Sequence, residues 1–160
     1  YAQFSWLTNV WLGLDARNPG QLGRDLMGGF VSKHIEKTGC SVIDESISKI
    51  EEADEKRARE VYSFYRDYKL SIKHVSSNIK LQGYACFVVG NRTVKGEFLE
   101  TDIFTKEAFE ECGFEHITTE IRKLPNTRMP SRVSPSGKKG KTAPTMSQEY
   151  IVICKKIKAI

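Results

Sequence analysis

Residues 83–92 read Gly-Tyr-Ala-Cys-Phe-Val-Val-Gly-Asn-Arg, and this stretch decides the fold. The apolar run from Tyr84 to Val89 is too short for a buried helix and is rich in aromatic and β-branched residues. Because glycines bound it on both sides, the run predicts a strand that is buried on both faces. Helical patterns precede and follow it, which predicts an open α/β sheet with helices over both faces.

Three residues with different chemistry follow this strand directly: Gly90, Asn91 and Arg92. In open α/β sheets, ligands bind just beyond the carboxyl ends of the strands. This position therefore combines a flexible backbone, an amide and a cation, and it predicts that ligands bind at this edge of the sheet. Taken alone, the same residues fit an ordinary tight turn between a strand and a loop equally well.

Amphipathic helical patterns precede the strand. Residues 1–12 carry apolar side chains at helical spacing, and residues 43–50 form a short apolar stripe. A longer stripe with three-and-four spacing runs from Val61 to Ile79. Its aromatic residues are typical of a protein core, so we interpret this helix as part of the layer that covers the sheet.

A second group of elements follows the strand. Residues 101–109 predict a helix, which Gly113 ends. Residues 114–124 and 149–155 predict two more strands, the second of which contains the apolar run Tyr-Ile-Val-Ile-Cys. These two strands could pair antiparallel across the segment between them.

The composition is that of a globular domain. The 160 residues are 39% hydrophobic and 28% charged, which suits one domain with its own core. No apolar run approaches the roughly 20 residues of a membrane helix. Residues 1–14 lack the basic start and cleavage site of a secretory signal peptide. We therefore expect a cytoplasmic protein with no membrane partner.

Basic residues are concentrated in one segment. The net charge of the whole chain is +5, but residues 121–148 contain seven basic and no acidic side chains, which leaves the remainder near −2. Such a segment favours a polyanionic partner, although a merely solvated loop would have the same composition. Within it, residues 125–145 are rich in Pro and Gly and predict a long loop, of the kind that is usually functional or disordered. The candidate phosphate contacts are Arg128, Arg132, Lys138, Lys139 and Lys141.

No motif for catalysis or metal binding is present in the sequence. The three histidines lie outside any nucleophile motif, and there is no phosphate loop and no dinucleotide fingerprint. The four cysteines lie far apart, and none is beside a histidine at ligand spacing, so we predict no metal site. Motifs alone therefore do not show the chemistry of this chain.

The order of the predicted elements is more informative. The predicted order is helix, strand, helix, strand, long loop, strand. This order is similar to the closing half of the Rossmann-like fold of class I S-adenosylmethionine-dependent methyltransferases. That fold ends in an antiparallel hairpin whose last strand is inserted in the sheet. Three segments resemble one group within it, the DNA amino-methyltransferases of restriction-modification systems: Tyr1-Ala-Gln-Phe-Ser-Trp-Leu7, residues 81–96, and residues 122–132 with Tyr150-Ile-Val-Ile153.

The resemblance implies a function. Residues 1–160 would form the C-terminal part of a domain that transfers a methyl group from S-adenosylmethionine to an exocyclic amino group of adenine or cytosine in DNA. The target base would be flipped out of the duplex, with Gly90, Asn91 and Arg92 lining the cleft that receives it. The basic loop at 125–145 would clamp DNA through phosphate contacts.

The sequence also departs from that family. The glycine-rich cofactor motif and the Pro-Pro-Tyr catalytic motif are both absent from this chain. We expect an upstream half, in the same or another chain, to carry them and to bind most of the cofactor, so that this chain is inactive alone. A non-catalytic nucleic-acid-binding or assembly module remains the alternative, and a protein-interaction fragment is a third. A binding module would bind DNA without S-adenosylmethionine.

Overall fold

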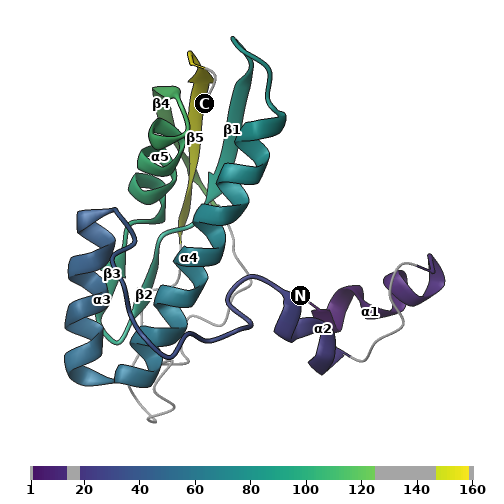
Figure 1. The fold of residues 1–160 in the computed structure, drawn as a ribbon, viewed down its shortest axis with the longest axis vertical. Coiled ribbons are helices and arrows are strands. Elements are labelled where there is room, and N and C mark those ends of the chain that lie inside the picture. Colours follow the sequence, from purple (N-terminus) through teal and green to yellow (C-terminus); the bar gives the residue numbers. More distant parts are fainter. Residues whose placement is uncertain (1, 14–18, 125–146, 159–160) are drawn as a thin grey trace.

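A computed structural model describes residues 2–13, 19–124 and 147–158 (Figure 1). Within these residues four helices come first, and three strands, a fifth helix and two long strands follow, so both helices and strands are present, as the sequence predicts for an α/β fold. The elements are α1 (Ala2–Trp11), α2 (Pro19–Asp25), α3 (Ser41–Ala53), α4 (Glu55–Asn78), β1 (Tyr84–Val89), β2 (Arg92–Val94), β3 (Glu97–Leu99), α5 (Thr101–Glu111), β4 (Phe114–Lys123) and β5 (Gln148–Lys156).

The main sheet has the strand order β1-β5-β4, so the last strand lies between the other two. β5 runs antiparallel to both neighbours, with Ile151 opposite Val88 on one side and Glu120 on the other. β1 and β4 therefore run parallel to each other, and α5 connects them. The predicted insertion of the last strand into the sheet is confirmed.

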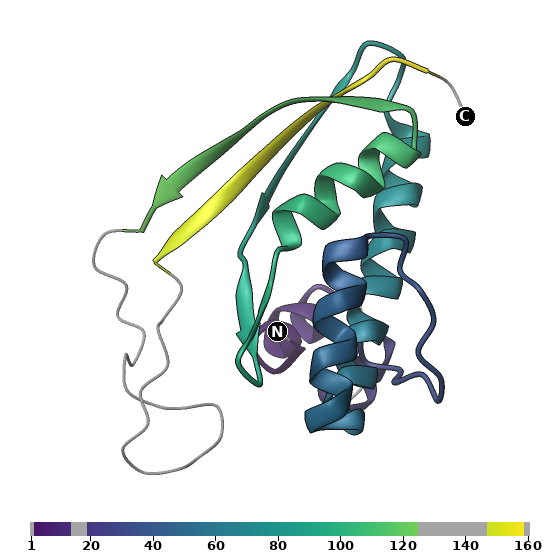
Figure 2. The ribbon, with the colours of Figure 1, turned by 90° about the vertical axis from the view of Figure 1, so that its left-hand side faces the viewer.

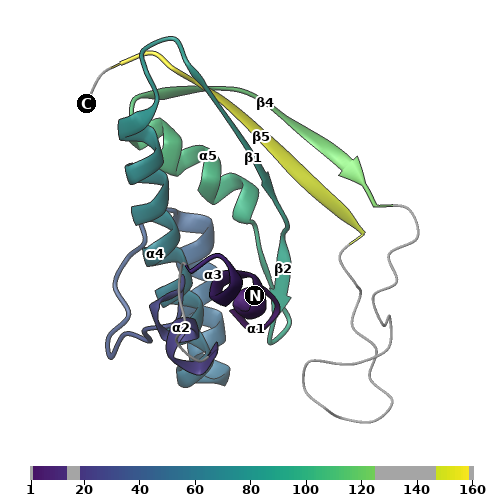
Figure 3. The same ribbon diagram turned by 90° about the vertical axis from the view of Figure 1, so that its right-hand side faces the viewer.

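One helical layer covers one face of this sheet. Figures 2 and 3 show α3, α4 and α5 together on the same side of the three strands. The layer meets the sheet through aromatic contacts, since the ring centroid of Phe109 lies 4.9 Å from that of Phe87 and 5.1 Å from that of Phe114. Within the layer, the rings of Tyr65 and Phe104 are 4.7 Å apart, and both side chains are 1% exposed. This aromatic contact joins α4 to α5.

The prediction that β1 is buried on both faces is wrong for the described residues. Ala85 is 3% exposed and faces the helices, whereas Tyr84 is 58% and Val88 54% exposed on the opposite face. The physical reason is that all three large helices lie on one side. No helix or strand in the described part of the chain covers the other side of β1.

A small hairpin that the sequence did not predict lies directly beyond β1. β2 and β3 pair antiparallel, and two residues with positive φ connect them, Lys95 (53°) and Gly96 (96°). Positive φ at both positions is typical of the tightest hairpin connections, and glycine adopts it without strain. An ion pair of 2.8 Å between Lys95 and Asp54 ties the hairpin to the start of α4.

Candidate functional site

Asn91 lies at the carboxyl end of β1, where the sequence predicts a ligand-binding edge. Its Nδ2 donates a hydrogen bond of 2.7 Å to Oδ1 of Asp102, and the backbone N–H of Asp102 donates one of 3.2 Å to Asn91 Oδ1. Asp102 lies in the first turn of α5, whose N–H groups have no partner within the helix. Asn91, which is 8% exposed, therefore joins the end of β1 to the start of α5.

Gly90 and Arg92, the other two predicted cleft residues, remain accessible. Gly90 is half-buried and Arg92 is exposed. Within the described residues, the guanidinium of Arg92 has no ion pair, in contrast to Arg57, which pairs with Glu60 at 2.5 Å. The structure thus leaves one cation available at this end of the strand.

Arg92 also lines a cavity of about 340 Å³ between α4, the β2–β3 hairpin and residues 27–31. Phe64 and Tyr65 contribute aromatic surface to the same cavity. Gly28 has a φ of +75°, and a Cβ there would lie 3.4 Å from the Cα and Cβ of Phe64. The close approach of this backbone to α4 brings residues 27–31 next to Arg92, a juxtaposition that no local sequence signal indicates.

The chemistry of this cavity is aromatic with charged side chains at its edges. The Tyr65 hydroxyl shares a hydrogen bond of 2.9 Å with Thr101 Oγ1, and burial raises the pKa of Tyr65 to about 12. Tyr65 therefore stays protonated and neutral at physiological pH, and it supplies an apolar ring rather than a charge. Such a site suits a flat ring near an anionic group.

The distal part of the β4–β5 hairpin forms an arm that extends beyond the helical layer (Figures 2 and 3). Arg122 and Glu149 form an ion pair across its two strands, and Leu124 N donates a 2.9 Å hydrogen bond to Ser147 O. The arm therefore holds both ends of the basic segment side by side. The five predicted phosphate contacts, and the whole loop at 125–145, lie outside the described residues: Arg128, Arg132, Lys138, Lys139 and Lys141.

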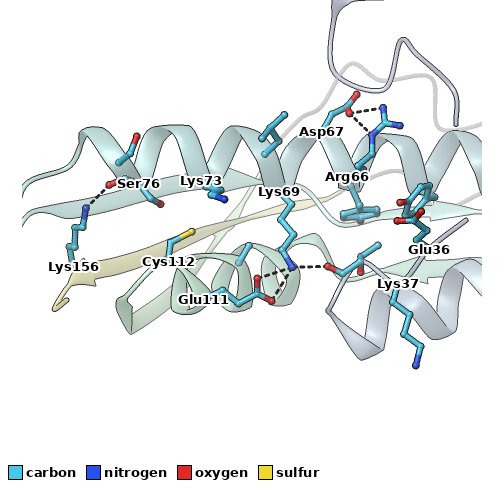
Figure 4. A pocket seen from close by; sticks show the side chains of 16 residues that line it. Glu36, Lys37, Arg66, Asp67, Lys69, Lys73, Ser76, Glu111, Cys112 and Lys156 are labelled. Atoms are coloured by element: carbon cyan, nitrogen blue, oxygen red, sulfur yellow. Dashed lines mark hydrogen bonds and ion pairs between the residues drawn. The ribbon is translucent and has the colours of Figure 1, made fainter. Parts of the chain in front are cut away.

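A second cavity, of about 680 Å³, lies between α4 and α5 (Figure 4). Lys69 Nζ lies 2.7 Å from Glu111 Oε2 and donates a hydrogen bond of 2.8 Å to Thr38 O. Lys156 Nζ donates to Ser76 O at 2.7 Å and to Ile79 O at 2.9 Å, at the end of α4. Since Lys69 and Lys156 are bound by the protein itself, we assign these two side chains a structural role. No helix in the described ranges is long and apolar enough to cross a membrane.

Comparison with known proteins gives a match in sequence and none in structure. No family model matches the chain, and no solved structure matches it. The Type II methyltransferase M.MvaI of Kocuria varians is 38% identical to it over 164 residues. The match covers 97% of this chain but 36% of that enzyme, and it falls in the enzyme's C-terminal part. The chain therefore corresponds in sequence to the C-terminal part of a Type II methyltransferase and spans little more than a third of that enzyme's length.

Proposed function

We propose that this chain is the C-terminal part of an enzyme that transfers a methyl group from S-adenosylmethionine to an exocyclic amino group of adenine or cytosine in DNA. The main support is its 38% identity to a Type II methyltransferase over 97% of its length. The strand order β1-β5-β4 supports the same conclusion, because the inserted last strand is the feature that the resemblance implies. A cytoplasmic location fits this function.

The target base would be received at the carboxyl end of β1. In this proposal Gly90 offers its backbone, Arg92 offers a cation, and Asn91 holds the edge in place through Asp102. Flipping the base exposes its amino group, and the protein mainly orients the two reactants and excludes water. S-adenosylmethionine supplies the electrophilic methyl group.

The cofactor would be bound mainly by a preceding region of the enzyme. The cavity beside Arg92 has aromatic walls, and its edge carries the Arg57–Glu60 ion pair and Arg92. The charge that is left unpaired among these three is positive, and it suits an anion better than a sulfonium. The chain spans little more than a third of its relative, 36%, so a preceding region in the same or another chain has room for the cofactor site. This chain alone is then inactive.

DNA would be held by the basic segment at 125–145, which joins the two strands of the arm in sequence. Replacing Lys138, Lys139 and Lys141 by Ala should weaken binding to every DNA sequence, because phosphate contacts do not read bases. The slope of log affinity against log salt should fall by roughly 0.9 for each phosphate that the variant no longer neutralises. Replacing Lys49, Lys56 and Lys73, on α3 and α4, is the matched control and should leave the slope unchanged. An equal effect of both triple variants would contradict the proposal.

The proposed reaction is tested on the chain combined with the part of the K. varians enzyme that precedes the matched segment, which we call the preceding region. The mixture is incubated with DNA and S-adenosylmethionine, and the digested nucleosides are analysed by mass spectrometry. We expect N6-methyladenine or N4-methylcytosine. DNA that is bound but never methylated would favour the alternative, a non-catalytic nucleic-acid-binding module, which the seven basic residues within 121–148 also fit.

A further inference from the structure

The β2–β3 hairpin has two faces with different surroundings. Side chains alternate between the faces of a strand, and Arg92, Val94 and Leu99 line the cavity next to α4. The other face, which we call the outer face, carries Thr93 and Phe98, opposite each other in the register of the two strands. Both are exposed, and Phe98 is 51% exposed. The hairpin therefore presents one aromatic ring on the side away from the cavity.

The backbone that carries Phe98 is fixed in place. Val94 and Leu99, on the inner face, are 6% and 1% exposed. Ser46 Oγ on α3 donates a hydrogen bond of 3.3 Å to the backbone carbonyl of Phe98, and Lys95 ties the turn to the start of α4. These contacts hold the hairpin without covering the ring. A side chain on such an ordered backbone has less freedom to lose when it binds a partner.

The outer face carries no charge. Both of its side chains are neutral, whereas the charged residues of the hairpin, Arg92, Lys95 and Glu97, lie on the inner face or at the turn. A neutral flat ring suits a nucleobase, which offers a π-face whatever its identity, better than it suits a phosphate. Because a single exposed apolar residue is common on protein surfaces, its location must decide whether it has a partner.

The hairpin lies where the bound DNA is expected. It begins directly after the carboxyl end of β1, at the proposed target-base cleft. Val89 at that end lies opposite Tyr150, which lies opposite Ile121 at the base of the arm. Figures 2 and 3 show the hairpin and the arm at the same end of the sheet. DNA that is held by the basic segment between the strands of the arm would therefore pass close to the outer face.

Base flipping creates a need for such a ring. When the target base leaves the duplex, it leaves a gap in the stack and a partner base without its pair. Proteins that unstack DNA bases often insert an apolar side chain, phenylalanine among them, into the opened step. Within the hairpin, Phe98 is the exposed side chain that could fill this gap.

We propose that Phe98 enters the gap that the flipped base leaves in the duplex and stacks on the unpaired partner base. The inner face of the hairpin then lies towards the flipped nucleotide, and the outer face lies towards the duplex. The inference deepens the proposed function and rests on it. Its ligand is an unpaired nucleobase within duplex DNA.

The experiment measures DNA affinity by fluorescence anisotropy for the mixture of this chain and the preceding region. The methylated position is first located by sequencing the product DNA. Two labelled duplexes of that sequence are compared, one intact and one with an abasic residue in place of the partner base. Phe98→Ala should weaken binding to the intact duplex about tenfold, the range expected for one stacked base. On the abasic duplex, the ratio of native to variant affinity should fall from about ten to about one.

Two further variants separate stacking from general effects. Phe98→Leu keeps an apolar side chain but removes the flat ring, so it should lose most of the same affinity. Leu81→Ala is the matched control, because Leu81 is 54% exposed and lies before β1, at the other end of the strand from Asn91. It should change neither affinity nor methylation. Urea unfolding verifies that each variant is folded.

Three results would overturn the proposal. The first is an unchanged affinity of Phe98→Ala for the intact duplex. The second is an equal loss on the intact and abasic duplexes, which would show that the ring does not stack on the partner base. The third is weaker association of Phe98→Ala with the preceding region in size-exclusion chromatography, which would make the ring a contact between the two parts. Each of these can occur while the mixture still methylates DNA, and the proposed function would then stand.

A mixture that binds DNA without methylating it is tested through Phe98→Trp. Stacking of an indole on a base quenches its fluorescence, so DNA should reduce the emission of this variant more than that of the native chain. Such quenching would keep Phe98 as a base contact and contradict the proposed function. Equal emission changes in the variant and the native chain, or no DNA binding at all, would overturn both.

Discussion

The two faces of the main sheet are built from the same strands but have different surroundings. On the face towards the helices, Val152 is 1% and Cys154 0% exposed. On the other face, Tyr84 is 58% and Val88 54% exposed, although these residues are as apolar as their buried neighbours. The difference shows that apolar sequence alone does not reveal which face a given part of a protein buries by itself. The open face has the composition of a core without its covering layer.

The largest expected contrast is between two phenylalanines. Phe104 is 1% exposed within the helical layer, and Phe98 is 51% exposed on the hairpin beyond β1. Phe104→Ala should lower the free energy of unfolding by about 3–5 kcal/mol, because it removes a buried ring and leaves a cavity. Phe98→Ala should change it by about 0.5 kcal/mol or less. Urea unfolding of both variants checks this, and similar losses would contradict the burial of Phe104 in the helical layer and the exposure of Phe98 on the hairpin.

A second contrast compares two valines on neighbouring strands. Val152→Ala on β5 should cost about 2 kcal/mol, from two buried carbon atoms at about 0.8 kcal/mol each and a small cavity. Val88→Ala should cost about 0.5 kcal/mol or less in the isolated chain, since that side chain is 54% exposed. In the assembled protein the destabilisation by Val88→Ala should increase. A value that stays the same after addition of the preceding region would contradict the interpretation of this face as a core without its covering layer.

Asn91 should give a smaller effect on the isolated chain. Asn91→Ala removes both hydrogen bonds to Asp102 and should lower the free energy of unfolding by about 1–2 kcal/mol. In the assembled enzyme it should also reduce methylation per folded molecule, because the edge of the proposed target-base cleft loses its anchor. Reduced stability with unchanged turnover per folded molecule would make Asn91 a purely structural residue.

The last expected effect is absent at neutral pH and is confined to alkaline pH. Burial raises the folded-state pKa of Cys154 to about 11 from an ordinary value of 9.0, so the neutral thiol stabilises the fold fully below pH 9. That contribution should be lost as the pH rises from about 9 towards 11, because the unfolded chain releases the proton first. Cys154→Ala should reduce this pH dependence, and Cys86→Ala, on the open face, is the control. Unfolding curves between pH 8 and about 11 test the difference.

The sequence predicted the elements that local signals define. β1 was predicted at its observed bounds because glycines flank a β-rich run, and the two strands of the final hairpin were each predicted to within one residue at either end. The family resemblance predicted the insertion of β5, which no propensity indicates. The hairpin of β2 and β3 was missed because strands of three residues have almost no periodic signal.

The site was predicted less well than the fold. The sequence placed Asn91 at the correct end of β1. Its two hydrogen bonds to Asp102 depend on where the start of α5 lies relative to the end of β1, which local sequence signals do not show. The cavity beside Arg92 depends on residues 27–31, which lie about 60 positions earlier and are brought close by the path of the chain over α4. The prediction that both faces of β1 are buried was wrong. An apolar run shows that its residues are suited to burial, but it does not show which part of the protein packs against them.

Hydrogen exchange of the backbone amides of β1 and β4 tests most directly whether this chain is one part of a sheet that another region completes. Exchange is measured for the chain alone and with the preceding region in excess. We predict that amides of β1 gain protection, because their free edge becomes paired, and that amides at the outer edge of β4 exchange as before. Unchanged exchange of β1 in a mixture that has associated, or new protection along β4, would contradict this prediction.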